Sequence, residues 1–280
     1  MLARRWLGDI FFILATGGTT ASHPAAAFVS PSLARQRVLR QSLTTRQMSL
    51  EVEQKFQLSD AAGLESKLKS LGFQPTGNIT FVDWYFDNDE NYLSTRDCWL
   101  RCRQKSGASQ WELKRGRGHS GTTVYEEIEG DDACFEAVSV LKKGGYKIMG
   151  HDHERRAEIF DGFPVPKLPI QSPHGLRPFC RLETTRSSWT VESSESQYVG
   201  LAVDLDATNT GHTVGEVETL CDESEVELGK QRVQSLIEKL IVKQHASQQT
   251  AIGKLEHFLM NNRPDHYAAC VASGVIQKTT

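Results

Sequence analysis

The most constraining feature of the chain is a charge pattern that repeats at every second residue. The segment "EVEQKF", residues 51–56, places Glu51, Glu53 and Lys55 at alternate positions. Successive side chains of a β-strand point to opposite faces, so this strand would have one charged face and one mostly apolar face. A single half-exposed strand whose charges meet solvent would show the same alternation. The case for a function therefore depends on whether the pattern recurs.

The same spacing does recur in five later segments. The alternating residues are Trp99, Arg101 and Arg103 in "CWLRCR", Glu112 and Lys114 in "WELK", Tyr125, Glu127 and Glu129 in "YEEIE", Asp204 and Asp206 in "VDLD", and Glu216 and Glu218 in "GEVE". Two carboxylates on one strand face repel each other unless cations lie between them. Acidic and basic rows on consecutive strands therefore predict a closed sheet with a charged lumen.

A lumen of this kind suits a polyphosphate and divalent cations. The basic residues that would bind phosphate oxygens are Lys55, Arg101, Arg103, Lys114 and, from "TTRSSW", Arg186. Arginine binds phosphate through paired hydrogen bonds and lysine as a point charge. The carboxylates that would hold metal are Glu51, Glu53, Asp204, Asp206, Glu216 and Glu218. Mg²⁺ prefers a few carboxylates together with substrate phosphates and water.

Helical patterns surround the predicted sheet, which makes the fold class α+β. Apolar residues at helical spacing predict helices within residues 59–73, 134–145 and 224–244. Residues 150–180 contain five prolines and are interpreted as a long surface connection between two halves of one barrel.

The charge distribution argues against a nucleic-acid partner. The formal net charge is −3, yet the six arginines and single aspartate of residues 1–50 leave 26 basic and 34 acidic residues for the rest. A body this acidic holds anions only at local clusters of positive charge. The six cysteines are scattered and are interpreted as reduced thiols. No apolar run reaches the ~18 residues that a membrane span requires.

The first fifty residues are expected to be a targeting presequence. Arg4 and Arg5 precede the apolar run "IFFILA", and small residues follow up to "AAAF", with cleavage expected before Phe28. Residues 30–50 are rich in Ser, Thr, Gln and Arg, as transit peptides are. This arrangement resembles a bipartite plastid presequence. A mitochondrial presequence is one alternative, and translation from Met48, giving a cytoplasmic protein, is another.

"EVEQKF" carries an ExExK signature and resembles the CYTH family, the triphosphate tunnel metalloenzymes. The later motifs "WLRCR", "WELK", "VDLD", "VGEVE", "GKLEHFL" and "RPDHY" are similar, in the same order, to those of its thiamine-triphosphatase branch. The resemblance covers residues 51–267 and leaves 268–280 as a tail. It implies an eight-stranded antiparallel tunnel with flanking helices, a monomer that hydrolyses a small-molecule triphosphate with Mg²⁺, and Mn²⁺ as a substitute metal.

The resemblance also implies roles for individual residues. Lys254 joins the phosphate-binding set, and Glu127 joins the acidic set. Lys55 and Arg101 are expected to be the most sensitive catalytic positions, with Tyr125 ordering a neighbour such as Lys55. Without the resemblance, Lys254 would be interpreted as an ordinary solvated lysine.

Following the resemblance, two aromatic residues are expected to contribute to any specificity for thiamine. Trp99 shares a face with Arg101 and Arg103, so its indole could stack on the thiazolium cation, a contact of ~0.5–2 kcal/mol. Tyr85, in "DWYFD", matches a family position near the thiamine end. The alternative is that Trp99 closes one end of the core. Inorganic triphosphatases and class IV adenylate cyclases share the ExExK strand, so an inorganic triphosphatase and a non-catalytic polyphosphate-binding module remain competing hypotheses.

Overall fold

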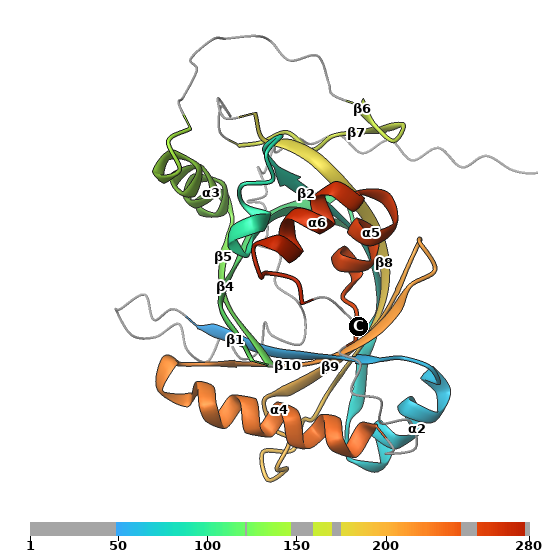
Figure 1. Cartoon of the computed structure of the whole chain (residues 1–280). Coiled ribbons are helices and arrows are strands. Elements are labelled where there is room, and N and C mark those ends of the chain that lie inside the picture. The colour runs from blue at the N-terminus through green and yellow to red at the C-terminus, as the bar shows by residue number, and fades with distance from the viewer. Residues whose placement is uncertain (1–48, 121, 147–158, 170–174, 242–250, 278–280) are drawn as a thin grey trace, which may run out of the picture.

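Eight antiparallel strands close into a barrel in the computed structural model (Figure 1). The structure describes residues 49–120, 122–146, 159–169, 175–241 and 251–277. Around the barrel the strands follow the order β1-β10-β9-β8-β2-β3-β4-β5. Their bounds are β1 Leu50–Gln57, β2 Gln74–Asp87, β3 Cys98–Lys105, β4 Ala108–Ser120, β5 Thr122–Glu129, β8 Arg177–Thr190, β9 Leu201–Thr208 and β10 Thr213–Cys221. This confirms the predicted α+β fold with a closed eight-stranded antiparallel barrel.

Helices occur at all three predicted places. They are α2 Ala61–Ser70, α3 Asp131–Lys143 and α4 Val226–Leu240. The α2 helix begins after Asp60, whose carboxylate accepts a 3.0 Å hydrogen bond from the backbone N–H of Gly63. Short 3₁₀ turns, η1 Ser94–Arg96 and η2 Glu223–Glu225, lie before β3 and α4. In the expected surface connection, β6 Ile159–Phe160 and β7 Phe163–Pro164 form a small separate hairpin.

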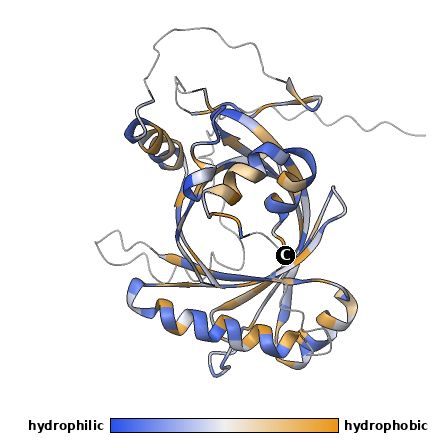
Figure 2. Ribbon diagram, in the orientation of Figure 1, coloured by the Kyte–Doolittle hydropathy of each residue, from blue (hydrophilic) through white to orange (hydrophobic). Residues whose placement is uncertain are grey.

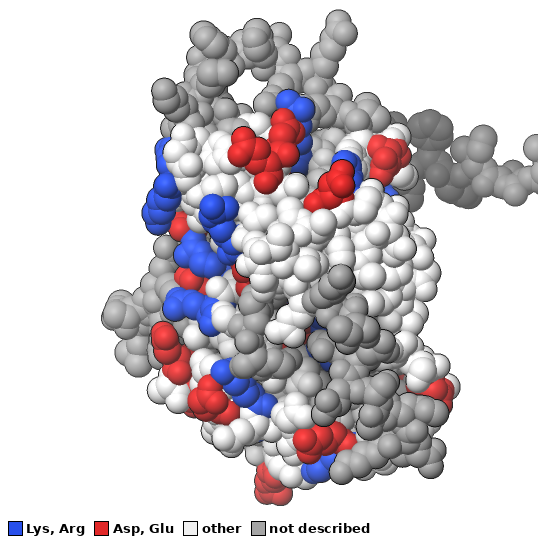
Figure 3. All heavy atoms as spheres, viewed as in Figure 1, with Lys and Arg blue, Asp and Glu red and all other residues white. Residues whose placement is uncertain are grey.

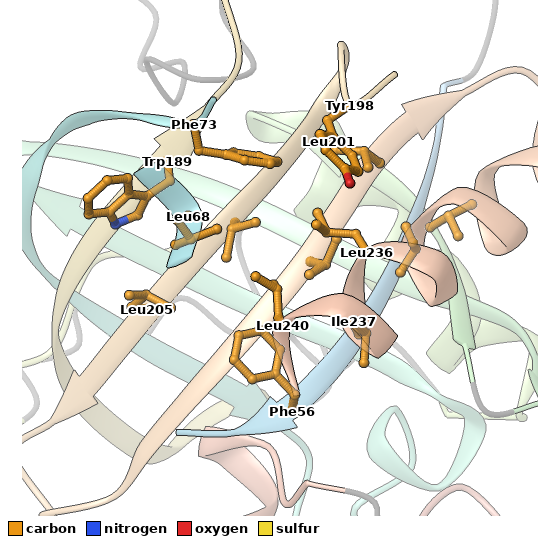
Figure 4. Packing of buried hydrophobic residues seen from close by; sticks show 14 of the residues in the cluster. Phe56, Leu68, Phe73, Trp189, Tyr198, Leu201, Leu205, Leu236, Ile237 and Leu240 are labelled. Carbon is orange, nitrogen blue, oxygen red and sulfur yellow. The ribbon is translucent and has the colours of Figure 1, made fainter. Parts of the chain in front are cut away.

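The outer side of the barrel is covered by two apolar layers. On one side α4 and α2 pack against β1, β9 and β10, where Val52, Phe56, Val203 and Val217 alternate with the charged residues. Figure 4 shows Phe56 of β1 in this layer with Leu236 and Leu240 of α4. On the other side α3 covers β3 and β4 at a cluster that includes Leu100. The α4 helix is hydrophobic toward the barrel and hydrophilic on its other side (Figure 2). The apolar face of each alternating strand is therefore buried on the outside of the barrel, beneath the helices.

Two C-terminal helices, α5 Lys254–Asn262 and α6 Pro264–Ala272, lie across the part of the barrel next to β2 and β8 (Figure 1). Phe258, Leu259 and Cys270 of these helices pack against Tyr85 and Leu182 on the inner faces of β2 and β8. Leu182 lies opposite Asp83 in the register, so this cluster belongs to the lumen. The α5–α6 plug therefore fills one part of the lumen and leaves the charged part beyond it.

The expected domain boundaries fall partly outside the described residues. Nearly all of the expected presequence, 1–50, lies there. The boundary expected after Tyr267 falls inside α6, and Ile276 in the expected tail is buried in the plug. Among the described residues, no helix is long and apolar enough to cross a membrane.

Candidate active site

The charged row of β1 points into the lumen. Lys55 Nζ donates a hydrogen bond to Glu53 and another, 3.0 Å long, to Glu216 Oε1 on β10. Lys55 lies directly opposite Glu216 in the strand register, and Glu53 opposite Glu218. Glu51 and Glu53 are only 3% and 2% exposed, so these charges do not meet solvent on the outer surface. The row therefore forms part of a buried network of ion pairs.

Lys114 on β4 reaches the same row from across β5. Its Nζ donates to Glu51 and, at 3.1 Å, to Glu53. Burial by itself lowers the pKa of Lys114, but Glu51 and Glu53 hold the pKa well above the usual lysine value. Lys55 shows the same balance, with Glu216 and Glu53 as the raising charges. Both ammonium groups therefore stay protonated in the lumen.

The two β3 arginines are held by carboxylates from both neighbouring strands. Arg103 donates two hydrogen bonds of 2.8 Å to Asp83 on β2, and Arg101 Nε donates one of 2.6 Å to Glu112 on β4. Arg101 also lies 3.9 Å from Asp83 and 3.7 Å from Glu127. Burial raises the pKa of Glu127, with Glu51 adding to the effect, to about 7. The N–H donors of each arginine are therefore held in place, and the Asp83 carboxylate lies near both arginines.

Asp83 was not predicted from the sequence, and Glu112 was predicted only as one of the charged residues of the lumen, without a binding role. Asp83 lies between Val82 and Trp84, so no neighbouring charge marks it. Its only signal is that it alternates with Phe81 and Tyr85 on the inner face of β2. Glu112 did carry a signal, since it precedes Lys114 by two positions and must share its face.

A second group of charges lies where β8, β9 and α5 meet. Arg186 donates two hydrogen bonds of 2.7 Å to Asp206 and forms an ion pair with Asp204. Lys254, the first residue of α5, donates to the same Asp206 carboxylate. A side-chain carbon at the preceding Gly253 would lie 3.3 Å from Lys55, so the start of α5 runs close to the β1 row. The structure thus places Lys254 in the lumen, as the family resemblance implied.

Four carboxylates gather in the lumen with too few cations between them: Glu51, Asp204, Glu216 and Glu218. Burial raises the pKa of Glu218 well above its usual value, and the other three carboxylates add to the effect. Asp204 is 1% exposed, and its Oδ1 has no hydrogen-bond partner. A buried carboxylate oxygen without a partner is costly, and a hard cation would satisfy it.

The donor chemistry of this carboxylate group therefore fits Mg²⁺. Still, no three His, Cys, Asp or Glu side chains in the described part of the chain converge closely enough to form a coordination sphere. Here Glu51, Asp204 and Glu216 are engaged by Lys114, Arg186 and Lys55 instead. Binding a metal would require these carboxylates to turn away from the cations.

Tyr125 lies on β5 opposite Glu51. The Lys114 ammonium is 5.5 Å from the centre of its ring. Burial, with the nearby charge of Glu53, raises the pKa of the Tyr125 phenol, so the phenol is neutral at physiological pH. The sequence prediction assigned Tyr125 to Lys55; the charges of both Lys55 and Lys114 act on the pKa of the phenol, and Lys55 has the larger effect of the two.

Trp99 and Tyr85 lie where the charged lumen meets the α5–α6 plug. Tyr85 is 6% exposed, and its ring centre lies 6.3 Å from that of Phe179. Trp99 packs against the same apolar cluster, and its Nε1 donates a 2.8 Å hydrogen bond to Asp97. In the strand register Tyr85 lies opposite Arg101 and Trp99 opposite Lys114, so both rings are adjacent to cations while much of their surface is used in packing.

A group of paired cations lies inside the barrel. On the face of Figure 1, Lys and Arg side chains gather along one edge, and the centre is mostly uncharged (Figure 3). Among the described residues, six cations that face the lumen and donate to a carboxylate come from five elements. They are Lys55, Arg101, Arg103, Lys114, Arg186 and Lys254. The fold and site together define a closed β-barrel whose lumen is lined with paired, buried charges.

Comparison with known proteins identifies the family. Residues 49–258 match the CYTH domain. The thiamine-triphosphatases of Macaca fascicularis and Homo sapiens are each 31% identical over 225 residues, covering 78% of this chain and 87% of theirs. The solved structure of PH1819 protein from Pyrococcus horikoshii OT3 has a TM-score of 0.46 at 16% identity, covering 76% of this chain and 99% of that one. The chain belongs to the CYTH family.

Proposed function

We propose that this protein hydrolyses thiamine triphosphate to thiamine diphosphate and phosphate in a Mg²⁺-dependent reaction. The observation that carries the proposal is the lumen itself, where six cations from five elements are each paired with a carboxylate. The 31% identity to two thiamine-triphosphatases supports hydrolysis of a phosphoanhydride and a triphosphate substrate.

The cations would act by taking phosphate oxygens in place of their present carboxylate partners. Arg101 and Arg103 on β3, Arg186 on β8 and Lys254 on α5 would contact different oxygens of the triphosphate. Charge spreads over the oxygens of the transferred phosphoryl group, so fixed donors stabilise the transition state. Burial makes these contacts stronger than they would be in water. Lys55 and Arg101 keep their positive charge because carboxylates raise both pKa values.

The metal would be held by the carboxylates that lack enough cations, namely Glu51, Asp204, Glu216 and Glu218, with Glu53 and Asp206 as further candidates. Bound Mg²⁺ would supply additional positive charge to the phosphate oxygens and would orient water. Members of this family are generally metal-dependent. A triphosphate that engages Lys55 and Arg186 would free Glu216 and Asp204 to face the metal.

Inorganic triphosphate is the second candidate substrate, and the packing of Trp99 favours it. Since the indole already contacts the α5–α6 plug and donates to Asp97, it has less free surface for a thiazolium ring. A third hypothesis is a module that binds polyphosphate without cleaving it. Such a module would need the lumen cations but not the four carboxylates proposed to hold the metal.

The deciding experiment measures phosphate release from thiamine triphosphate, inorganic triphosphate and ATP at matched concentrations, with Mg²⁺, with Mn²⁺ and with EDTA. Faster phosphate release from thiamine triphosphate than from the other two substrates, together with loss of this activity in EDTA, supports the proposal. Preference for inorganic triphosphate keeps the triphosphatase and removes thiamine from it. If no substrate releases phosphate but tripolyphosphate still binds in calorimetry, the non-catalytic binding module is favoured.

We also propose that residues 1–50 direct plastid import. A fluorescent fusion of those residues would test this.

A further inference from the structure

Phe81 on β2 is a large apolar side chain placed among charges. It is 2% exposed, yet it belongs to none of the three apolar clusters found in the described residues. It precedes Asp83 by two positions, so its ring lies on the inner face of the barrel. Its partner in the register on β8 is Thr184, two positions before Arg186. Packing in an apolar core therefore does not account for a phenylalanine here.

The ring is the shared neighbour of three lumen cations. The Arg103 guanidinium carbon lies 4.2 Å from the ring centre, that of Arg186 5.4 Å, and the Lys254 ammonium 5.8 Å. These cations come from β3, β8 and α5. An aromatic face attracts cations at such distances, and the attraction is stronger where water is excluded.

This contact leaves the hydrogen-bond donors of the cations available. A guanidinium carries its N–H groups in its plane and can stack through its face. Arg103 already uses in-plane donors on Asp83, and Arg186 uses them on Asp206. A carboxylate competes directly with phosphate for these donors, whereas a ring does not. The ring would therefore keep the cations in place while phosphate oxygens replace carboxylates.

We propose that Phe81 is a positioning residue for the triphosphate: its ring holds Arg103, Arg186 and Lys254 in the lumen without occupying their N–H donors, which can then exchange carboxylate oxygens for phosphate oxygens. The inference rests on the proposed function, because it assigns these cations to the substrate. It predicts an effect mainly on substrate binding, since the cations contact phosphate both before and during the reaction.

The test compares Phe81→Leu, which keeps an apolar side chain but removes the aromatic face, with Phe81→Tyr, which keeps the face. The matched control is Phe73→Leu, a buried ring in the outer cluster under α2. We expect Phe81→Leu to raise KM roughly tenfold, with kcat changed less than about threefold. Phe81→Tyr and Phe73→Leu should stay within about twofold of the natural chain. Phe81→Met replaces Phe81→Leu should that variant not fold.

Calorimetric binding of inorganic tripolyphosphate to the same full-length proteins separates this inference from the proposed function. A roughly tenfold weaker Kd for Phe81→Leu alone supports the inference, even where the natural chain shows no turnover. Equal loss in Phe81→Leu and Phe73→Leu, or in Phe81→Leu and Phe81→Tyr, overturns it and leaves the proposed function standing. Failure of the natural chain both to bind and to hydrolyse any triphosphate overturns both.

Discussion

Arg103 on β3 and Asp83 on β2 lie opposite each other in the strand register and are joined by two hydrogen bonds of 2.8 Å. The Asp83 carboxylate is 1% exposed. Burial alone would raise its pKa, but Arg103 and Arg101 lower the pKa to about 2. The same pair thus sets the orientation of a predicted phosphate-binding group and couples the stability of the barrel to pH.

We predict that Asp83→Asn lowers the free energy of unfolding by about 2 kcal/mol at pH 7. This is the free energy that corresponds to the lowering of the Asp83 pKa on folding. A carboxylate whose pKa is lowered on folding stabilises the protein above its unfolded pKa, and that contribution is lost as pH falls toward 2. The difference between the two proteins should therefore shrink to about half at pH 3. Urea unfolding at both pH values measures it. A difference that is the same at pH 7 and pH 3 would contradict the assignment.

The lumen charges on β1, β3, β9 and β10 could be predicted from sequence because a strand has a period of two. Once Glu51, Glu53 and Lys55 share a face, the apolar residues between them must face the other way. The structure shows both halves, with Val52 and Phe56 packed under α4. Burial of both faces is what makes the alternation so regular.

Asp83, Phe81 and the plug could not be predicted in this way. Asp83 has no charged neighbour at alternate positions, and Phe81 reads as an ordinary core residue. The α5–α6 plug depends on tertiary packing of Phe258 and Leu259 against β2 and β8, which no local pattern contains. Lys254 entered the candidate set only through the family resemblance, since by pattern alone a lysine at the start of a helix is a surface residue.

We predict that Arg101→Ala reduces kcat for triphosphate hydrolysis by about two to three orders of magnitude. The guanidinium is held by Glu112, 2.6 Å away, and lies near Asp83 and Glu127, so the alanine variant loses a cation that is fixed in the lumen. Lys142→Ala on the exposed side of α3 is the control for loss of one positive charge and should leave kcat unchanged. Steady-state kinetics of both variants, with unfolding curves, measures the effect. Near-normal kcat in Arg101→Ala would remove Arg101 from the catalytic set.

We predict that Glu216→Gln separates binding from hydrolysis. The Glu216 carboxylate pairs with Lys55 and is one of the four lumen carboxylates proposed to hold the metal. Its loss should therefore reduce Mg²⁺-dependent turnover by at least about 100-fold. Binding of tripolyphosphate in EDTA should not weaken, because Lys55 loses a competitor. Glu223→Gln, on the surface at η2, is the matched control. Unchanged turnover in Glu216→Gln would remove this residue from the metal site and favour the binding module.

The final prediction concerns Trp99, whose indole packs on the α5–α6 plug and donates to Asp97. If the indole also stacks on the thiazolium cation, Trp99→Ala should lower kcat/KM for thiamine triphosphate roughly tenfold and change the value for inorganic triphosphate less than about twofold. Trp99→Phe keeps an aromatic face and should recover most of the loss. Parallel kinetics on the two substrates measures the ratio. An equal loss on both would show that Trp99 acts by packing the plug, because only a contact with the thiamine moiety can distinguish substrates that share the same three phosphates.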